Sequence, residues 1–134
     1  MNVVIMGCGR VGSTVATRLD AEGHTVTIID TDAQAFRRLG EGFRGKRLVG
    51  SGTDDAVLVR SGLREADAFL ALTQGDNRNL LASQKAKHIY DVETVVTRVY
   101  DPRRGELFAR LGLRTFSPTE ISAELAYSSL FGER

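Results

Sequence analysis

Three glycines near the start of the chain stand in the spacing G-x-G-x-x-G, at Gly7, Gly9 and Gly12, directly after an apolar run over residues 3–6. Between a strand and a helix, the first glycine makes a tight turn, the second lets a diphosphate approach the backbone, and the third lets the helix pack closely on the strand. The helix N-terminus adds unpaired N–H groups and partial positive charge. The motif predicts a phosphate-binding loop, and a merely tight turn is the alternative.

The residues between these glycines offer further chemistry. Arg10 could pair its guanidinium with a phosphate through two hydrogen bonds, which suits ADP or ATP as well as a dinucleotide, and an exposed arginine on the first helical turn is the alternative. Cys8 would gain thiolate character from the helix N-terminus, but we favour a small residue that fills the loop over a redox switch. We expect the whole loop over residues 7–12, Val11 included, to contact a nucleotide.

An acidic residue stands where the second part of this fingerprint belongs. Asp30 ends the next β-rich apolar run, and at that place a carboxylate accepts hydrogen bonds from both ribose hydroxyls of an adenosine. Asp30 would repel a 2′-phosphate, and no arginine follows directly at Thr31 and Asp32, which disfavours NADP. We therefore expect Asp30 and Thr31 to contact the cofactor, and we assign Asp32 to the cap of the next helix.

Short apolar runs alternate along the chain with segments of helical period, a pattern typical of an open parallel sheet with right-handed crossovers. We expect an α/β fold, a doubly wound, Rossmann-like parallel sheet of six strands with helices on both faces, which spans residues 1–134 as a single nucleotide-binding domain. Ligands bind such sheets beyond the carboxyl ends of the strands, so the site should follow the first four strands. The expected strands are 3–6, 25–29, 46–49, 67–72, 94–99 and 114–116, and the expected helices lie between residue 11 and Gly23, at 32–40, 53–61, 76–90, 102–112 and 118–130.

Composition excludes several classes of function. The 134 residues include 18 lysines and arginines against 17 acids, and a net charge of +1 gives no reason to expect nucleic acid or anionic lipid as the main partner. One cysteine forms no intrachain disulfide, and no Cys/His cluster has zinc-ligand spacing. No apolar stretch approaches the roughly 20 residues of a bilayer span, and the N-terminus lacks a signal-peptide pattern. The sequence therefore predicts a cytoplasmic protein.

Three further segments are more specific than a dehydrogenase fingerprint. The run GSGTD follows the third strand at residues 50–54, ALTQGDNRN follows the fourth at 71–79, and TRV ends the fifth at 97–99. Together with the glycine loop and Asp30, they resemble the N-terminal nucleotide-binding domain of the Trk/Ktr potassium-uptake regulators, also called the RCK, KTN or TrkA-N domain. The resemblance covers essentially the whole chain.

The resemblance implies a set of contacts with an adenine nucleotide. Small residues at the carboxyl ends of strands leave room for a planar base beside the glycine loop. Helix capping is an alternative role for Thr53 and Asp76, and hydrogen bonding to a loop is one for Asn79 and Arg98. The implied contacts are Ser51, Gly52 and Thr53 with the adenine, Ala71, Leu72 and Thr73 with the pyrophosphate and ribose, and Asn79 and Arg98 as residues that order the central cleft.

The resemblance also implies a function. Such a domain would bind NAD(H), ADP or ATP, with the choice left open, and would gate a membrane potassium channel or transporter, to which it would be peripheral. Many relatives place a Pro-Glu pair after the sixth strand, near the nucleotide or a cation. This chain has Pro118-Thr119-Glu120, so we expect Glu120 to be a first-turn helix acid and no metal to bind.

The last expected helix carries apolar side chains at several angles, among them Leu125, Tyr127, Leu130 and Phe131. A helix of that kind has more apolar surface than one sheet face can cover, so we expect it to pack on a second copy of the chain, as a dimer or a higher ring. A plain terminal core helix is the alternative.

A nicotinamide-dependent oxidoreductase, as the cofactor-binding domain without its substrate domain, is the competing function because many such enzymes begin with the same fingerprint. Hydride transfer needs a substrate pocket with an acid or base that faces the nicotinamide. His24 precedes the second strand at the opposite end of the sheet, and His88 lies late in a helix, so neither is placed for that role. We therefore predict a regulatory binding module without catalytic residues.

Overall fold

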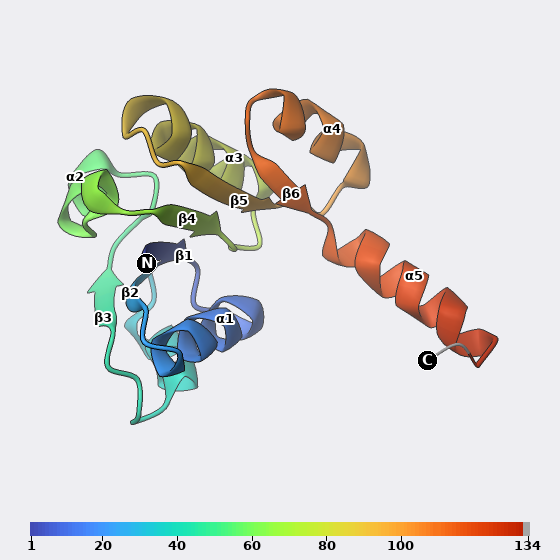
Figure 1. Cartoon of the computed structure of the whole chain (residues 1–134), viewed down its shortest axis with the longest axis horizontal. Coiled ribbons are helices and arrows are strands. Elements are labelled where there is room, and N and C mark those ends of the chain that lie inside the picture. Colours follow the sequence, from blue (N-terminus) through green and yellow to red (C-terminus); the bar gives the residue numbers. More distant parts are fainter. Residues whose placement is uncertain (133–134) are drawn as a thin grey trace.

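A computed structural model describes residues 1–132 of the chain. Six parallel strands form one sheet in the order β3-β2-β1-β4-β5-β6 (Figure 1). The chain winds outward in both directions from the centre of the sheet, with a switch point between β1 and β4, and the doubly wound, Rossmann-like fold is confirmed. The strands are β1 (Asn2–Met6), β2 (Thr25–Asp30), β3 (Lys46–Val49), β4 (Ala68–Ala71), β5 (Thr94–Arg98) and β6 (Arg114–Phe116).

A helical segment follows each strand of the sheet. The expected bounds 46–49, 114–116 and 118–130 agree with the structure, and the other bounds differ by no more than two residues at either end, apart from the two segments described below. The segments are α1 (Arg10–Ala21), the 3₁₀ helix η1 (Ala33–Leu39), α2 (Asp55–Arg60), the short 3₁₀ helix η2 (Leu63–Glu65), α3 (Asp76–Gln84), the π-helical segment η3 (Lys85–Ile89), α4 (Pro102–Arg110) and α5 (Pro118–Leu130).

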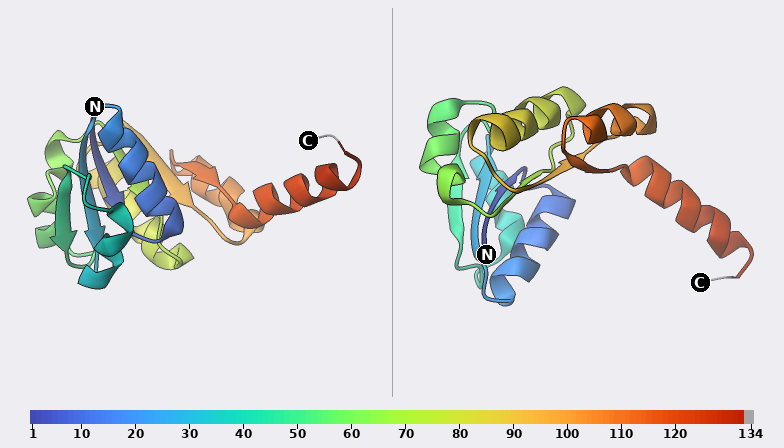
Figure 2. Two further views of the ribbon diagram at one scale, coloured as in Figure 1. Left: turned by 90° about the horizontal axis from the view of Figure 1, so that it is seen from below. Right: turned by 45° about the horizontal axis from the view of Figure 1, so that its top comes forward.

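Both faces of the sheet are buried, which explains why β1 is apolar without alternation. Successive side chains of a strand point to opposite faces. Val3 and Ile5 join the core beneath α1 and η1, whereas Val4 and Met6 join the core beneath α2, α3 and α4. Figure 2 shows these two helical layers on the two sides of the sheet.

Two helices differ from the expected α-helices. The segment expected at 32–40 is a 3₁₀ helix whose buried Phe36 and Leu39 are three residues apart, the spacing that one face of a 3₁₀ helix shares. Asp32 caps it, as expected, because its carboxylate accepts a hydrogen bond from the Gln34 N–H at 2.9 Å. The helix expected at 76–90 changes to π-helical turns at Lys85, whose carbonyl accepts from the N–H five residues later.

Helix α5 extends away from the sheet (Figure 1). It begins at a good cap, since Ser117 Oγ accepts from the Glu120 N–H at 3.3 Å and Pro118 occupies the first turn. None of its residues is buried, and Tyr127 and Leu130 are 64% and 77% exposed. The alternative of a terminal core helix is therefore wrong. No helix within residues 1–132 has the length and apolarity to cross a bilayer.

Candidate functional site

A cleft of about 670 Å³ opens at the carboxyl ends of the strands, where loops after β1, β2, β3 and β4 meet the end of β5. The topology rule predicted a site after the first four strands, the family resemblance added Arg98 at the end of the fifth, and residues from all five strand ends line the cleft. Thirteen of the residues expected to contact a nucleotide line this cleft: Gly7, Cys8, Gly9, Arg10, Val11, Asp30, Thr31, Ser51, Gly52, Thr53, Leu72, Thr73 and Arg98.

Three expected residues lie behind the walls of the cleft. Gly12 packs against the Gly7 carbonyl, where a Cβ would come within 1.8 Å of the oxygen. Ala71 is fully buried in the core beneath α3, because the alternation of β4 turns its side chain away from the face that Leu72 contacts. Asn79 is also fully buried. These residues shape the cleft from behind it.

The glycine loop gives each glycine a separate role. Gly7 has a φ of +107°, and its N–H donates to the Ile29 carbonyl at 2.8 Å, so the turn ties β1 to β2. Around a Cβ built on Gly9 nothing lies within 4 Å, so this is the position that a ligand can approach. No side chain caps the first turn of α1, which leaves its N–H groups directed at the cleft.

The Asp30 carboxylate is held at the edge of this loop. One oxygen accepts from the Cys8 N–H and the other from the Asp32 N–H, both at 2.8 Å. Each carboxylate oxygen has further lone pairs, so the group can accept two more hydrogen bonds from a ligand. Two neighbouring hydroxyls, as on a ribose, match that arrangement.

The Cys8 side chain faces the protein interior. It is fully buried, and its thiol donates to the Ala35 carbonyl at 3.4 Å. Burial, and secondly the charge of Asp30, raise the pKa of this thiol to about 11. The thiol is therefore protonated at neutral pH, which supports a loop-filling role and not a redox switch.

The loop after β3 forms the cleft wall beside Asp30. A Cβ on Gly52 would lie 2.1 Å from the Met6 sulfur, so a larger residue here would displace the Met6 side chain at the end of β1. The hydroxyls of Ser51 and Thr53 bond to each other at 2.8 Å. Thr53 does not cap α2, because Asp54 does so by accepting from the N–H two residues later. Small side chains line this wall of the cleft, which is where the resemblance placed the adenine.

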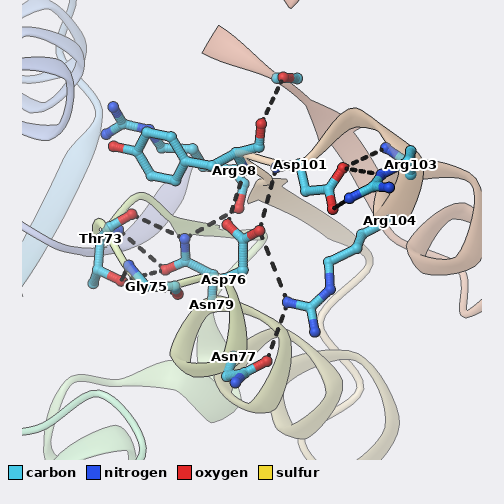
Figure 3. A network of polar contacts seen from close by, with 11 residues as sticks. Thr73, Gly75, Asp76, Asn77, Asn79, Arg98, Asp101, Arg103 and Arg104 are labelled. Atoms are coloured by element: carbon cyan, nitrogen blue, oxygen red, sulfur yellow. Dashed lines mark hydrogen bonds and ion pairs between the residues drawn. The ribbon is translucent and has the colours of Figure 1, made fainter. Parts of the chain in front are cut away.

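The loop after β4 is held by one buried side chain (Figure 3). Asn79 Oδ1 accepts from the Thr73 N–H at 3.1 Å and from the Thr73 hydroxyl at 2.6 Å. Its Nδ2 donates to the carbonyls of Thr73 and Arg98 at 3.0 and 3.1 Å. All four hydrogen bonds of the amide are therefore made inside the protein. Asn79 orders the cleft by joining the ends of β4 and β5.

Asp76 continues this network toward α4 (Figure 3). Its carboxylate accepts from the Tyr100 N–H at 2.8 Å and lies 3.9 Å from the Arg104 guanidinium. The cap position of α3 is occupied by Gly75, so the capping role considered for Asp76 is wrong. Asp76 instead fixes the loop between β5 and α4.

The charges of the cleft are unequal. Four arginines line it against two aspartates, Asp30 and Asp32, although the whole chain is close to neutral. The sequence reasoning missed Arg38 and Arg78. Arg78 stands directly before Asn79 in the ALTQGDNRN run, and Arg38 lies on the helix that follows Asp30. A search for arginines on the helices that follow each strand would have found both residues. The excess of guanidinium groups favours a polyanionic ligand.

Several other candidate residues lie outside the cleft. Glu120 is exposed in the first turn of α5, and within residues 1–132 no three His, Cys, Asp or Glu side chains gather as metal ligands. His24 Nδ1 lies 3.1 Å from the N-terminal amine, and His88 Nε2 lies 2.9 Å from the Leu111 carbonyl oxygen. Neither histidine lines the cleft.

Comparison with known sequences places most of the chain in one family. The TrkA-N domain family matches residues 3–118. The Trk system potassium uptake protein TrkA of Streptomyces coelicolor is 48% identical over 124 residues, which are 92% of this chain and 56% of that protein. A TrkA homolog of Pyrococcus abyssi is 35% identical over 97% of this chain and 60% of its own length. The chain thus spans a little more than half the length of these relatives.

Solved structures share the fold at lower identity. The TrkA-N domain of the inner membrane protein ybaL from Escherichia coli superposes with a TM-score of 0.85, at 15% identity and 96% coverage of both chains. The GsuK channel bound to NAD and GsuK bound to ADP each give a TM-score of 0.72 over 87% of this chain. They are 21% and 20% identical, and the matches cover 21% and 31% of those chains.

Proposed function

This chain belongs to the TrkA-N domain family, and from that premise we propose that it binds an adenine nucleotide in the cleft and thereby regulates a membrane potassium channel or transporter. The observation that carries the proposal is the Asp30 carboxylate, held by two backbone N–H groups beside a glycine loop that is open at Gly9. An adenosine would place its ribose hydroxyls on Asp30 and its phosphates along the loop.

The surroundings of the loop support an adenine nucleotide in particular. The small residues after β3 leave a flat space next to Asp30 for the base, and the arginines of the cleft supply charge for the phosphates. GsuK, which shares the fold, has been solved with NAD and with ADP. Both ligands contain an adenosine diphosphate, so the shared moiety is the one that Asp30 and the glycine loop would hold.

The regulatory role is proposed from the relatives and from α5. The two relatives described above are potassium uptake proteins of the Trk system. The exposed apolar surface of α5 would pack on a second copy of the chain, and the assembly would act on its membrane partner from the cytoplasm. Ser117, which caps α5, donates to the Tyr100 carbonyl at 3.4 Å, so α5 begins next to the network that holds the cleft.

We favour a regulator over an oxidoreductase because of the titratable groups in the cleft. Within the described residues these are two aspartates, Cys8 and four arginines. Asp30 already accepts two backbone hydrogen bonds, and the Cys8 thiol is buried with a raised pKa. Arginine holds its proton at neutral pH. Such groups bind and orient a nucleotide, but they do not supply a base poised for proton transfer at pH 7.

Calorimetry with AMP, ADP, ATP, NAD and NADH tests the proposal. We expect binding of adenine nucleotides to the parent chain, and a loss of about tenfold or more in Asp30→Ala, because charge-assisted hydrogen bonds are removed. Glu93→Ala, which removes the same charge at an exposed position outside the cleft, should bind as the parent does. Equal affinity of Asp30→Ala and the parent would refute the ribose assignment. Steady oxidation of NADH, abolished by a cleft substitution, would refute the regulatory reading.

A further inference from the structure

The loop after β3, which forms one wall of the cleft, is joined to the rest of the molecule by few hydrogen bonds. Within residues 1–132, two of them reach the loop from other segments. At its start, the Gly50 N–H donates to the Asp30 carbonyl at 3.0 Å. At its end, the ammonium of Lys85 donates to the Thr53 carbonyl at 2.9 Å. The other hydrogen bonds of the loop are local. The far half of this wall is therefore held through Lys85.

Lys85 lies behind this wall, outside the residues that line the cleft, at the point where α3 passes into η3. Its side chain is 20% exposed, so much of the water around its charge has been removed. The Thr53 carbonyl and the Asp55 carboxylate, which lies 3.4 Å from the ammonium, replace that water. Asp55 is in the first turn of α2. Lys85 thus connects the loop after β3, the start of α2 and the end of α3.

The π-helical turns of η3 bring a second residue to the same carboxylate. The Tyr90 N–H donates to the Lys85 carbonyl at 3.0 Å, a hydrogen bond that spans five residues. In an α-helix, residues five apart lie on different faces, whereas this wider turn brings them closer to one face. The Tyr90 hydroxyl donates to Asp55 at 2.9 Å, and the ring centre lies 5.5 Å from Arg64 Cζ. Lys85 and Tyr90 therefore hold Asp55 together.

We propose that Lys85 is a positioning residue for the base of the bound nucleotide, because it fixes the Thr53 carbonyl, and with it the wall after β3, without touching the ligand. This inference rests on the proposed function and adds a residue to it. A wall that is already fixed loses little freedom when a base binds against it, whereas a loop that is free at one end must first be ordered. Binding of the base should therefore depend on Lys85. Binding of the sugar and phosphates, which would contact Asp30 and the glycine loop, should not.

Amide hydrogen exchange of the chain without ligand tests whether Lys85 holds the loop. Lys85→Met keeps the stem of the side chain and removes the ammonium. The amides of Thr53 and Asp54, which donate to Ser51, should then exchange at least about tenfold faster than in the parent, because the loop opens more often. The Thr73 amide, in the loop after β4, should exchange as in the parent, because its partner Asn79 is unchanged.

Calorimetry tests whether the base depends on the loop. The two ligands are ADP and ribose 5-phosphate, which has no base and is measured by competition against ADP. Lys85→Met should weaken ADP by about fivefold or more and ribose 5-phosphate by less than about twofold. A variant that only disturbed the fold would weaken both ligands equally. Tyr90→Phe removes one hydrogen bond to Asp55, so it should weaken ADP by a smaller factor in the same direction.

Lys87→Met is the matched control for both measurements. Lys87 also lies on η3 and also donates to a carbonyl, that of Glu93 at 2.7 Å, but neither residue lines the cleft. The variant loses the same charge and the same kind of hydrogen bond. It should exchange the amides of both loops, and bind both ligands, as the parent does.

The outcomes separate the inference from the function on which it rests. If ADP binds the parent and depends on Asp30, but Lys85→Met leaves either the exchange of Thr53 and Asp54 or the ADP affinity unchanged, the inference alone fails. Equal weakening of ADP and ribose 5-phosphate also overturns it. If the parent binds no adenine nucleotide, both fail. Should ribose 5-phosphate not compete at millimolar concentrations, the exchange rates together with the ADP affinity decide.

Thermal unfolding followed by circular dichroism identifies any variant that does not fold. If Lys85→Met does not fold, Asp55→Ala decides by the same measurements, because it removes the exposed carboxylate that holds the Lys85 ammonium and the Tyr90 hydroxyl. An unchanged ADP affinity in that variant overturns the inference.

Discussion

The cleft and helix α5 differ in where their interactions come from. The loops after β4 and β5 at the cleft are held by hydrogen bonds within the chain, since Asn79 makes all four of its hydrogen bonds to Thr73 and Arg98. Along α5 the large apolar side chains face solvent, and the ring centroids of Tyr127 and Phe131 lie 5.2 Å apart. The cleft is held in shape by contacts within the chain, whereas α5 presents surface that is typical of an interface.

This difference indicates two kinds of function. A site fixed in advance loses little freedom when it binds a small ligand, so its geometry sets affinity and specificity. An exposed apolar helix contributes nothing to the core, so its side chains are expected to act in association. Substitutions of the residues that pack or bond the cleft loops together should therefore lower the free energy of unfolding, and substitutions on α5 should change assembly much more than stability.

The largest effect is expected at the glycine loop. Gly12→Ala would bring a Cβ within 1.8 Å of the Gly7 carbonyl oxygen, so the loop or α1 must shift. We expect the free energy of unfolding to fall by about 3 kcal/mol or more, measured by urea denaturation, with loss of nucleotide binding. Gly9→Ala is the matched control: its Cβ meets nothing within 4 Å, so it should fold normally and still weaken binding. If Gly12→Ala and the parent had equal free energies of unfolding, the cleft would not differ from α5 in its dependence on contacts within the chain.

The second largest effect on the free energy of unfolding is expected for Asn79, whose side-chain amide joins β4 and β5. Asn79→Ala leaves the backbone groups of Thr73 and the Arg98 carbonyl, which are half-buried, without these partners. We expect a loss of about 2–4 kcal/mol in the free energy of unfolding, again by urea denaturation, since each unpaired buried group costs about 1–3 kcal/mol. Asn77→Ala, an exposed amide on the same helix, should stay within about 0.5 kcal/mol of the parent. A similar small loss in both variants would show that the network does not hold the cleft.

A smaller effect depends on pH. The pKa of the Cys8 thiol is raised to about 11 in the folded chain, against 9.0 as its ordinary value. The unfolded chain ionises first, so the contribution of this thiol to stability is present below pH 9 and is lost as the pH rises toward 11, by about 2–3 kcal/mol. Denaturation of the parent and of Cys8→Ala between pH 8 and 11 measures it. The two curves should converge toward high pH, and parallel curves would contradict the burial of the thiol.

The sequence predicted those features that depend on local pattern. Apolar runs and helical periods gave the alternation of six strands and their helices, and Pro118 marked the start of α5. The glycine spacing and Asp30 gave the first half of the cleft. Such features follow from neighbours in the chain, because turns, caps and periodicity are local.

The remaining features depend on which strands lie side by side. Asp76 bonds to the loop after β5, and Asn79 to the end of β5, so their roles require the pairing of β4 with β5. Ala71 was expected at the cleft because the family segment begins there, but strand alternation places its side chain in the core. The register of a strand decides on which face of the sheet such a side chain lies, and the neighbouring residues in the sequence do not show that register.

The smallest effect on stability, and the sharpest effect on assembly, is expected on α5. The double variant Tyr127→Ser, Phe131→Ser removes two exposed rings, 64% and 61% accessible, whose mutual contact is a pair four residues apart. Such pairs stabilise a helix by about 0.2–0.5 kcal/mol, and serine has nearly the same helix propensity as tyrosine and phenylalanine. The free energy of unfolding of the monomer should therefore change by about 0.5 kcal/mol or less.

Association should respond quite differently, because burial of these rings against a second copy would contribute roughly 25 cal/mol for each Å² of apolar surface. Sedimentation at matched micromolar concentrations should show at least a dimer for the parent and a shift to monomer for the double variant. Ser128→Ala, on the same helix without an apolar loss, should assemble as the parent does. A monomeric parent, or a folded double variant that associates equally well, would contradict an isologous interface through α5. The cleft and α5 would then differ in exposure, but α5 would have no role in assembly that sets it apart from the cleft.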